Sequence, residues 1–575
     1  MHALIDQQPS GMCLNSYLLG WTMAWPCPND NGHMNETFVR LLEEFVPLRL
    51  SNELDDAMQG FTSDETNPSL DLPSKVLFPK VASDVVKTVQ FAKEHGIVLS
   101  VKNSGHSYAG SSSKKNTLLL NMNQYTHYDY APALDGITDC DTALLDSAVA
   151  DDLSNQACLL ALARGKSSVI RVGGGENFDK VYRAVSAANK ALDEYKYHVV
   201  GGLAGTVSPM GWTFQGGHSG ATGGRMYGMG VDQVLQVEMV LPNGYHVKFG
   251  PTEWEDATAD GFVVPRTKVV SGVCRNNPDE ENEEKWIWEA CPDDFDVDFG
   301  DLWFAVRGGG GGTWGVVTSV SLQLHNYLPY KELGFRGMES ECSPLLPKYL
   351  VFQAKYLMTP SVLNVTRESS LACGVGEPQI LHCYGDEDVL GAWTRFLEMN
   401  NLPSNASACL TTVNRDAKSF AEVLMGQDSR FPGKVADYPA PTLPPHVPSA
   451  FALIPQSWID ESEENLVFSV SADLIQYYSH GVATASFSDQ VNSLSQSQRD
   501  AALMAVFVDE HDLWSNIFPK LYDISDKTKF PPVFAANHAA TFLTGPLKED
   551  WTKVCPYEWT LEEREEKCIS SQEAI

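Results

Sequence analysis

The chain has no long hydrophobic run, little positive charge and no paired-cysteine metal motif. No apolar stretch approaches the roughly 20 residues that a helix needs to cross a bilayer, so we expect no membrane span. Lysine and arginine number 41 against 74 aspartates and glutamates, a formal charge of −33 over 575 residues. Because like charges repel, nucleic acids and anionic membranes are excluded as expected partners. The 12 cysteines form no CxxC pair and no zinc spacing, so we expect no metal.

Signals of cellular location point in two directions. The even number of cysteines and three N-glycosylation sequons, which begin at Asn35, Asn364 and Asn405, favour the secretory pathway. Residues Met1–Asn29, however, contain neither the basic start nor the clean apolar core of a signal peptide. We therefore expect a secreted glycoprotein, with an intracellular protein as the alternative.

An α+β layout is predicted from residue 75 onward. The apolar run Lys75–Phe78 indicates a strand, and Ser83 is placed to cap a helix that Gly96 ends. Two further strands, Ile97–Val101 and Thr117–Asn121, flank a polar loop rich in glycine and serine. Strand, helix, strand, loop, strand is typical of an α+β domain with a loop exposed between two buried strands.

Three later segments differ from this part in amino-acid composition. The glycine-dense block Val199–Gly244 ends in the predicted strand Val234–Leu241 and a Pro-Asn-Gly turn. The acidic insertion Asp279–Asp298 predicts a solvent-exposed loop, and a disulfide between the nearby Cys274 and Cys291 could cross-link it. The proline-rich stretch 431–455 predicts a long loop.

The loop after the second predicted strand has the composition of a phosphate-binding loop. Most residues from Asn103 to Ser112 are small, so backbone N–H groups can converge on a pyrophosphate with little obstruction. An acidic protein needs such local donors, because a dinucleotide is itself anionic. His106 lies in the middle of this loop. A lone histidine is more often structural, but a glycine–serine loop offers little core in which to bury it.

Two more glycine-rich segments follow in order. The second runs from Val200 through Gly216-Gly217-His218 to Tyr227–Asp232, and alone it could be a series of tight turns. The third, Asp301–Thr318, contains five successive glycines after Arg307 and permits close approach of chain to chain or chain to cofactor.

Together the three segments resemble the FAD-binding domain of the vanillyl-alcohol-oxidase superfamily, the fold named after p-cresol methylhydroxylase (PCMH), in its berberine-bridge-enzyme-like branch. The resemblance is specific from about residue 70 to 325 and implies an α+β protein. Its parts would be a two-part PCMH-type FAD-binding domain and a substrate domain with an antiparallel sheet covered by helices. The residues that it places at the FAD are Lys102, Asn103, Ser104, Gly105, His106, Ser107, Gly110, Ser111, Ala204, Gly205, Thr206, Val207, Gly211, Gly216, Gly217, His218 and Asp232.

The resemblance also implies how the flavin is attached. In this family the histidine at the position of His106 bonds to the 8α-methyl carbon of the flavin. Bicovalent members add a cysteine two residues before the threonine of the second segment, where this chain has Ala204. A methyl group cannot form that thioether, so a single 8α-histidyl link is implied. Val207 stands where the family places a residue near the flavin face, and a small valine there is similar to members that react with O₂.

The family resemblance and the changes in composition along the chain divide it into five predicted parts. They are an N-terminal extension (1–69), a PCMH-type FAD-binding domain (70–250), the end of the FAD-binding region with the acidic insertion (251–330), a substrate domain (331–505) and a C-terminal return to the FAD domain (506–575). The chain stops at Ile575 without the family's usual ending, which suggests truncation.

The implied activity is oxidation of an alcohol, carbohydrate or amine C–H bond by hydride transfer to flavin N5. The expected partners are a small-molecule substrate and O₂, which would yield H₂O₂. No catalytic base is assigned: Tyr384, Tyr477, Tyr478 and Glu461 are candidates, each more often an ordinary core or surface residue. Two alternatives stay open. One is a catalytically silent flavin-binding interaction protein, and the other is an FAD dehydrogenase that uses another acceptor.

Overall fold

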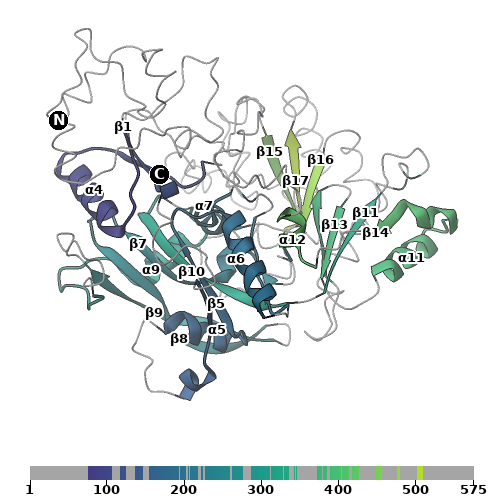
Figure 1. Cartoon of the computed structure of the whole chain (residues 1–575), viewed down its shortest axis with the longest axis horizontal. Helices are drawn as coiled ribbons and strands as arrows, with labels where there is room; N and C mark the ends of the chain where they lie inside the picture. Colours follow the sequence, from purple (N-terminus) through teal and green to yellow (C-terminus); the bar gives the residue numbers. More distant parts are fainter. Residues whose placement is uncertain are drawn as a thin grey trace, which may run out of the picture.

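A computed structural model gives the architecture of the central part of the chain (Figure 1). The residues that it describes are 75–105, 117–124, 136–146, 155–192, 195–202, 205, 207–217, 222–223, 227–259, 262–275, 287–310, 312–327, 329–335, 342, 345, 372–377, 380–384, 389–402, 404–412, 418–425, 449–455, 475–479 and 501–508. None of the helices in these ranges is both long enough and apolar enough to span a bilayer.

The first sheet is small, parallel and backed by one helix. Its strand order is β1-β3-β2, and the elements are β1 (Lys75–Leu77), α4 (Ala82–Glu94), β2 (Leu99–Lys102) and β3 (Leu118–Asn121). The apolar side of α4, with Val85, Val86 and Val89, is buried against Leu118 and Leu120 of β3. The predicted order of strands and helix is therefore confirmed.

The start of α4 differs from the prediction that Ser83 caps it. The helix already begins at Ala82, so Ser83 lies inside the first turn. The carboxylate of Asp84 instead accepts the backbone N–H groups of Lys80 (2.9 Å) and Val81 (3.3 Å). The predicted Ser83 cap is wrong, because the helix already begins at Ala82 and Val81 occupies the N-cap position, where Asp84 binds its N–H. Gly96, with a φ of 62°, follows the helix end as predicted.

The second sheet is larger and antiparallel. Its strand order is β4 (Ile137–Asp139), β5 (Ser168–Gly173), β10 (Val316–Asn326), β7 (Val234–Val240), β8 (His246–Ala259) and β9 (Phe262–Arg275), with β6 (Tyr197–His198) paired to β10. Alternate residues of a strand point to opposite faces. Ile170 and Val172 of β5 pack with α6 (Phe178–Ala191), whereas Val169 packs with α5 (Gln156–Ala163). The two helices thus cover opposite faces of the sheet.

The predicted strand 234–241 and the turn after it are confirmed by β7 and by Gly244, whose N–H donates to the Leu241 carbonyl. The suggested cross-link at the acidic insertion is also confirmed. Cys274, in β9, and Cys291, ahead of α9 (Phe299–Val306), form a disulfide.

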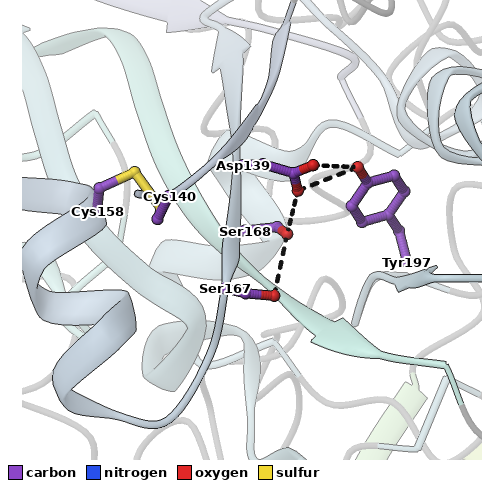
Figure 2. The surroundings of a disulfide bond; sticks show 6 residues. All are labelled: Asp139, Cys140, Cys158, Ser167, Ser168 and Tyr197. Atoms are coloured by element: carbon purple, nitrogen blue, oxygen red, sulfur yellow. Dashed lines mark hydrogen bonds between the residues drawn. A yellow bond between two sulfur atoms is a disulfide. The ribbon is translucent and has the colours of Figure 1, made fainter. Parts of the chain in front are cut away.

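A second disulfide secures the edge strand β4. Cys140 is bonded to Cys158 of α5, as Figure 2 shows. Next to it, the Asp139 carboxylate accepts hydrogen bonds from Ser168 Oγ at 2.7 Å and from the Tyr197 hydroxyl at 3.1 Å. Besides its pairing with β5, a disulfide and the hydrogen bonds of Asp139 therefore hold this strand of only three residues to its neighbours.

The chain from residue 330 onward forms two further antiparallel sheets. They lie on the right of Figure 1, away from the first two sheets. One has the order β12 (Ala372–Glu377), β13 (Ile380–Tyr384), β11 (Tyr330–Phe335), β14 (Leu410–Thr412); the other has β15 (Ser449–Pro455), β17 (Ala501–Val508), β16 (Ile475–Ser479). Helices α11 (Val389–Met399) and α12 (Phe420–Met425) accompany them. The predicted α+β class with an antiparallel sheet and helices in the later part is confirmed. The domain boundaries stay a prediction.

The expected long loop over 431–455 is wrong at its end. Residues 449–455 form β15, which pairs along its length with β17. The apolar run Ser449-Ala-Phe-Ala-Leu-Ile carries strand-forming residues, and the prolines that suggested a loop all precede it except Pro455 at its end. The earlier part of that stretch lies outside the described residues.

Candidate functional site

The end of β2 leads directly into the first glycine-rich loop. Lys102 is buried, and the side-chain amide of Asn103 donates a hydrogen bond to the carbonyl of Gly174 in the loop after β5. Gly105 has a φ of 80°, a left-handed conformation that side chains rarely adopt. The chain thus turns sharply just before His106. His106, Ser107, Gly110 and Ser111 lie outside the described residues, so their predicted roles stay predictions.

The second glycine-rich segment meets the first at the start of α6. The backbone N–H of Ser208 donates to Ser104 Oγ at 3.0 Å. The carbonyls of Gly205 and Val207 accept the N–H groups of Asp179 (2.8 Å) and Phe178 (2.9 Å), in the first turn of α6. The fold therefore brings together predicted residues that are about a hundred positions apart. Ala204, Thr206 and His218 lie outside the described residues.

Gly216, Gly217 and Asp232 form a separate cluster. Gly217 has a φ of 73°, and a Cβ on it would lie 2.5 Å from Gly230 Cα, so only glycine fits. The carbonyls of Gly216 and Gly217 accept the N–H groups of Val231 and Gly230. Asp232 accepts the N–H of Met229 at 2.9 Å. These contacts hold one backbone turn against another. Gly216, Gly217 and Asp232 therefore each have a structural role in this cluster.

Gly211 is placed differently from the other predicted glycines. It lies within α7 (Pro209–Phe214), and a Cβ on it would meet nothing within 4 Å. Close packing against the protein therefore does not require glycine at this position.

The third glycine-rich segment supports the other two. The N–H groups of Gly308 and Gly310 both donate to the Phe214 carbonyl, at 3.0 and 3.1 Å. Arg307 is buried, and its guanidinium lies 4.3 Å from the centre of the Trp303 ring. Through these contacts the segment anchors the end of α7, which agrees with the structural role that its sequence suggested.

Sequence reasoning missed Gly174 and Glu176, in the loop after β5. A Cβ on Gly174 would lie 2.5 Å from the Val317 carbonyl oxygen, so the loop approaches β10 closely. Burial raises the pKa of Glu176 to about 7, and Lys180, whose Nζ lies 3.1 Å from Glu176 Oε2, opposes that rise. The signal was the run of three glycines, 173–175, followed by Asn177, which caps α6.

The candidate base Tyr384 is not suited to proton abstraction at neutral pH. Its side chain is fully buried between β6 and β11, with ring centres 5.0 Å from His198 and 5.2 Å from Tyr330. Burial raises the pKa of Tyr384 well above its usual range, so the phenol stays protonated. The side chains of Tyr477 and Tyr478, and all of Glu461, lie outside the described residues.

Segments that are far apart in sequence are held together around the start of α6. Backbone groups and small residues from three loops converge there: Ser104, Gly174, Gly205 and Val207 come from segments far apart in sequence. The N–H groups of Phe178, Asp179 and Ser208 are used in these contacts, so an acidic chain would have to hold phosphates with other main-chain N–H groups of the loops. Within the described part of the chain, no group of His, Cys, Asp or Glu side chains is arranged to hold a metal ion.

Comparison with known proteins points to the same chemistry. Residues 73–135 match the family described as FAD binding domain. The FAD-linked oxidoreductase phmC of Phaeosphaeria nodorum is 30% identical over 254 residues, 44% of this chain and 40% of that protein. The FAD-linked oxidoreductase ffsJ of Aspergillus flavipes is 28% identical over 277 residues, 46% of this chain and 33% of that protein. The matched region thus spans well under half of either relative.

A solved structure extends the likeness to nearly the whole chain. The crystal structure of the VAO-type flavoprotein MtVAO615 from Myceliophthora thermophila C1 superposes with a TM-score of 0.52 at 18% sequence identity. The superposition covers 99% of this chain and 92% of that one. At this identity the likeness establishes the fold.

Proposed function

We propose that the chain is an FAD-linked oxidoreductase of the vanillyl-alcohol-oxidase/PCMH-type, berberine-bridge-enzyme-like flavoproteins and that it oxidises an alcohol, carbohydrate or amine. Bound FAD would supply the redox chemistry, which is acceptance of a hydride from the substrate and transfer of the two electrons to O₂ to give H₂O₂. The protein's part is to hold the dinucleotide, to orient the substrate and to accept its proton.

One observation carries the proposal. The hydrogen bond from the Ser208 N–H to Ser104 Oγ joins the two glycine-rich segments, and α6 begins at the same place. Neither segment alone is specific for a dinucleotide. The first segment lies in the region that matches an FAD-binding family, and its junction with the second segment at a helix start supports a common cofactor site.

We propose a single covalent link, from His106 to the 8α-carbon of the flavin. The sharp turn at Gly105, with its φ of 80°, directly precedes this histidine. Ala204, at the position of the second attachment in bicovalent relatives, offers only a methyl group. The proposed linkage therefore differs from the bicovalent pattern by one residue.

We propose O₂ as the electron acceptor on the basis of Val207. Its carbonyl is fixed by the N–H of Phe178, at 2.9 Å, and its side chain is partly buried against the core. A short, branched side chain held in this way leaves more space beside it than a longer one. If the flavin face lies next to it, O₂ has access.

Disulfides support the proposed location. Besides Cys140–Cys158 and Cys274–Cys291, the structure contains Cys342–Cys409. Disulfides persist in oxidising compartments, so we propose that the protein enters the secretory pathway. A mobility shift after enzymatic removal of N-glycans from the native protein tests this, and a protein without glycans or oxidised cysteines contradicts it.

The decisive experiment is the mass of the tryptic peptide that ends at Lys114 and contains His106. We expect it to carry the mass of a flavin, with the modification on His106, and the colour to remain with acid-precipitated protein. Peroxide release across a panel of alcohols, sugars and amines then tests the activity. A colourless protein, expressed with ample riboflavin, would overturn the proposal. A yellow protein that oxidises nothing would instead favour a flavin-binding interaction protein.

A further inference from the structure

Glu176 lies inside the junction of the three loops, and the proposed mechanism gives it no role. Two residues before it, Gly174 binds Asn103 of the first glycine-rich loop; two residues after it, Phe178 binds Val207 of the second. The side chain of Glu176 has no exposed surface. A carboxylate is therefore buried at the place where the two loops meet.

The partners of this carboxylate are few. Lys180 Nζ lies 3.1 Å from Glu176 Oε2, but the lysine side chain is 43% exposed and is also solvated. Among the described residues, Glu176 Oε1 has no hydrogen-bond partner. Burial of a carboxylate oxygen without a donor is costly, and native proteins rarely leave such an atom unpaired. The position therefore calls for a donor that does not belong to the described part of the chain.

Two other acids, each in the first turn of a helix, differ from Glu176 in this respect. Asp179, three residues later, is paired with Arg183 at 2.9 Å on the solvent side of α6, and the arginine side chain is 47% exposed. Asp84 is bound to the backbone at the start of α4. Of these three carboxylates, only Glu176 is both at the loop junction and short of a donor.

FAD offers two kinds of polar group along its length. Its phosphates are anionic acceptors, which a carboxylate repels. Its ribityl and ribose hydroxyls are donors, and a glutamate or aspartate beside a glycine-rich loop is a common acceptor for nucleotide sugar hydroxyls in another dinucleotide-binding fold. Resting on the proposed function, we infer that Glu176 accepts hydrogen bonds from sugar-type hydroxyl groups of the FAD and so fixes the cofactor between the two loops.

The test uses the full-length His106→Ala protein, in which the flavin can dissociate. Dissociation constants for FAD are measured by flavin fluorescence in this parent and in the parent carrying Glu176→Ala, Glu176→Gln or Asp179→Asn. We expect Glu176→Ala to weaken FAD binding at least about tenfold at about pH 8, since Glu176, with a pKa of about 7, is then mostly ionised and accepts as a charged group. Glu176→Gln, which keeps the shape but not the charge, should weaken it less. The control Asp179→Asn should bind like the parent.

Two smaller ligands distinguish the hydroxyl source. FMN carries only the ribityl hydroxyls, and ADP carries only the ribose hydroxyls. If Glu176→Ala weakens FMN binding but not ADP binding, the ribityl chain is the donor; the reverse result identifies the ribose.

The outcomes separate the two proposals. Equal FAD affinity in the parent and both Glu176 variants would overturn the role of Glu176 and leave the FAD site intact. A wild-type protein with no covalent flavin and a parent that binds no free FAD would overturn both. Thermal unfolding of each variant is recorded first; if Glu176→Ala does not fold, the shape-conserving Glu176→Gln decides.

Discussion

The backbone N–H of Ser208 donates a hydrogen bond to Ser104 Oγ at 3.0 Å, across 104 positions of sequence. Ser208 also caps α7, because its own Oγ accepts the N–H of Met210 at 3.2 Å. The first glycine-rich loop is thus fixed to the residue at which a helix of the second segment begins. The position of one loop depends on the position of the other.

Ser104→Ala removes the acceptor and leaves the partly buried Ser208 N–H without it. We expect a loss of about 0.5–1.5 kcal/mol in the free energy of unfolding, and a lower flavin content in the purified protein. Urea unfolding followed by fluorescence, together with the ratio of flavin to protein absorbance, measures both effects. Thr142→Ala, at an exposed position, is the control and should change neither. If Ser104→Ala retains full stability and flavin content, the junction is not held by this contact.

The sequence predicted well those parts of the fold that are set by local signals. The helix predicted between Ser83 and Gly96 is α4, whose buried Val85, Val86 and Val89 have the spacing of one helix face, and Gly96 follows its end with a positive φ. The strand β7 and its Pro-Asn-Gly turn were equally clear. Where two local signals competed, as Ser83 and Asp84 did for the start of α4, the prediction was wrong.

The candidate site was only partly predictable. Its glycine-rich segments could be found from composition, but their junction at the start of α6 depends on contacts between distant residues, such as Asn103 with Gly174, 71 positions apart. Nothing local indicates that Glu176 is buried, and burial alone gives it an unusual pKa. Likewise, the position of Tyr384 within a closed aromatic cluster was not visible in the sequence around it.

If Val207 has its proposed role, a larger side chain at this position should slow the reaction of the reduced flavin with O₂. Val207→Ile adds one methylene to a partly buried side chain and leaves the backbone bond to Phe178 in place. If this side chain borders the path of O₂, reoxidation should slow by about tenfold, a rise of ~1.4 kcal/mol in the barrier. The protein is reduced chemically and mixed with oxygenated buffer in a stopped-flow instrument, so no substrate is needed.

The smaller variant Val207→Ala controls for loss of packing. It should fold less stably but reoxidise at least as fast as the parent. Reoxidation of Val207→Ile at the parental rate would mean that Val207 does not control access of O₂, and the dehydrogenase alternative would then have to be judged on other residues.

Two glycines of the second segment offer a matched pair of substitutions. A Cβ on Gly201 would lie 2.5 Å from the Tyr182 hydroxyl oxygen and 2.6 Å from Phe178 Cε1, whereas a Cβ on Gly211 meets nothing within 4 Å. Gly201→Ala should therefore cost about 1–3 kcal/mol of stability through overpacking. Gly211→Ala lies within α7 and should be neutral or stabilising by up to about 1 kcal/mol.

Thermal unfolding measures both changes, and flavin content adds a second readout for Gly211. A Gly211→Ala protein that is stable but poor in flavin would support the predicted contact of Gly211 with the cofactor. Equal stability of the two variants would contradict the packing that the structure gives to Gly201.

A buried carboxylate on β7 predicts how stability depends on acid. Glu238 Oε1 lies 2.5 Å from Arg171 Nη2 and 3.2 Å from Lys248 Nζ, and the glutamate side chain is 3% exposed. Burial acts to raise the pKa of Glu238, but the charges of Arg171 and Lys248 outweigh it and hold the pKa well below its ordinary value of 4.5. Folding therefore favours the ionised form. The stabilisation is complete above about pH 4.5 and is lost as the pH falls below that value.

Glu238→Gln keeps the shape of the side chain but leaves two cations without their counter-charge. We expect it to lower the free energy of unfolding at pH 7 by about 3 kcal/mol, and the difference from wild type should shrink as the pH falls below about 4.5. Burial and the charge of Arg275 lower the pKa of the neighbouring His246 to about 3, so this histidine stays uncharged down to about pH 4. It is present in both proteins and therefore does not contribute to the difference between them. Urea unfolding of both proteins at pH 7, 5 and 4 gives the difference in free energy of unfolding at each pH.

Glu253→Gln is the matched control: Glu253 Oε2 lies 3.8 Å from Lys268 Nζ and both side chains are more than 60% exposed, so the change in free energy of unfolding should stay within about 0.5 kcal/mol at every pH. A Glu238→Gln difference that is absent at pH 7, or that does not decline with acid, would show that the buried ion pair does not stabilise the sheet.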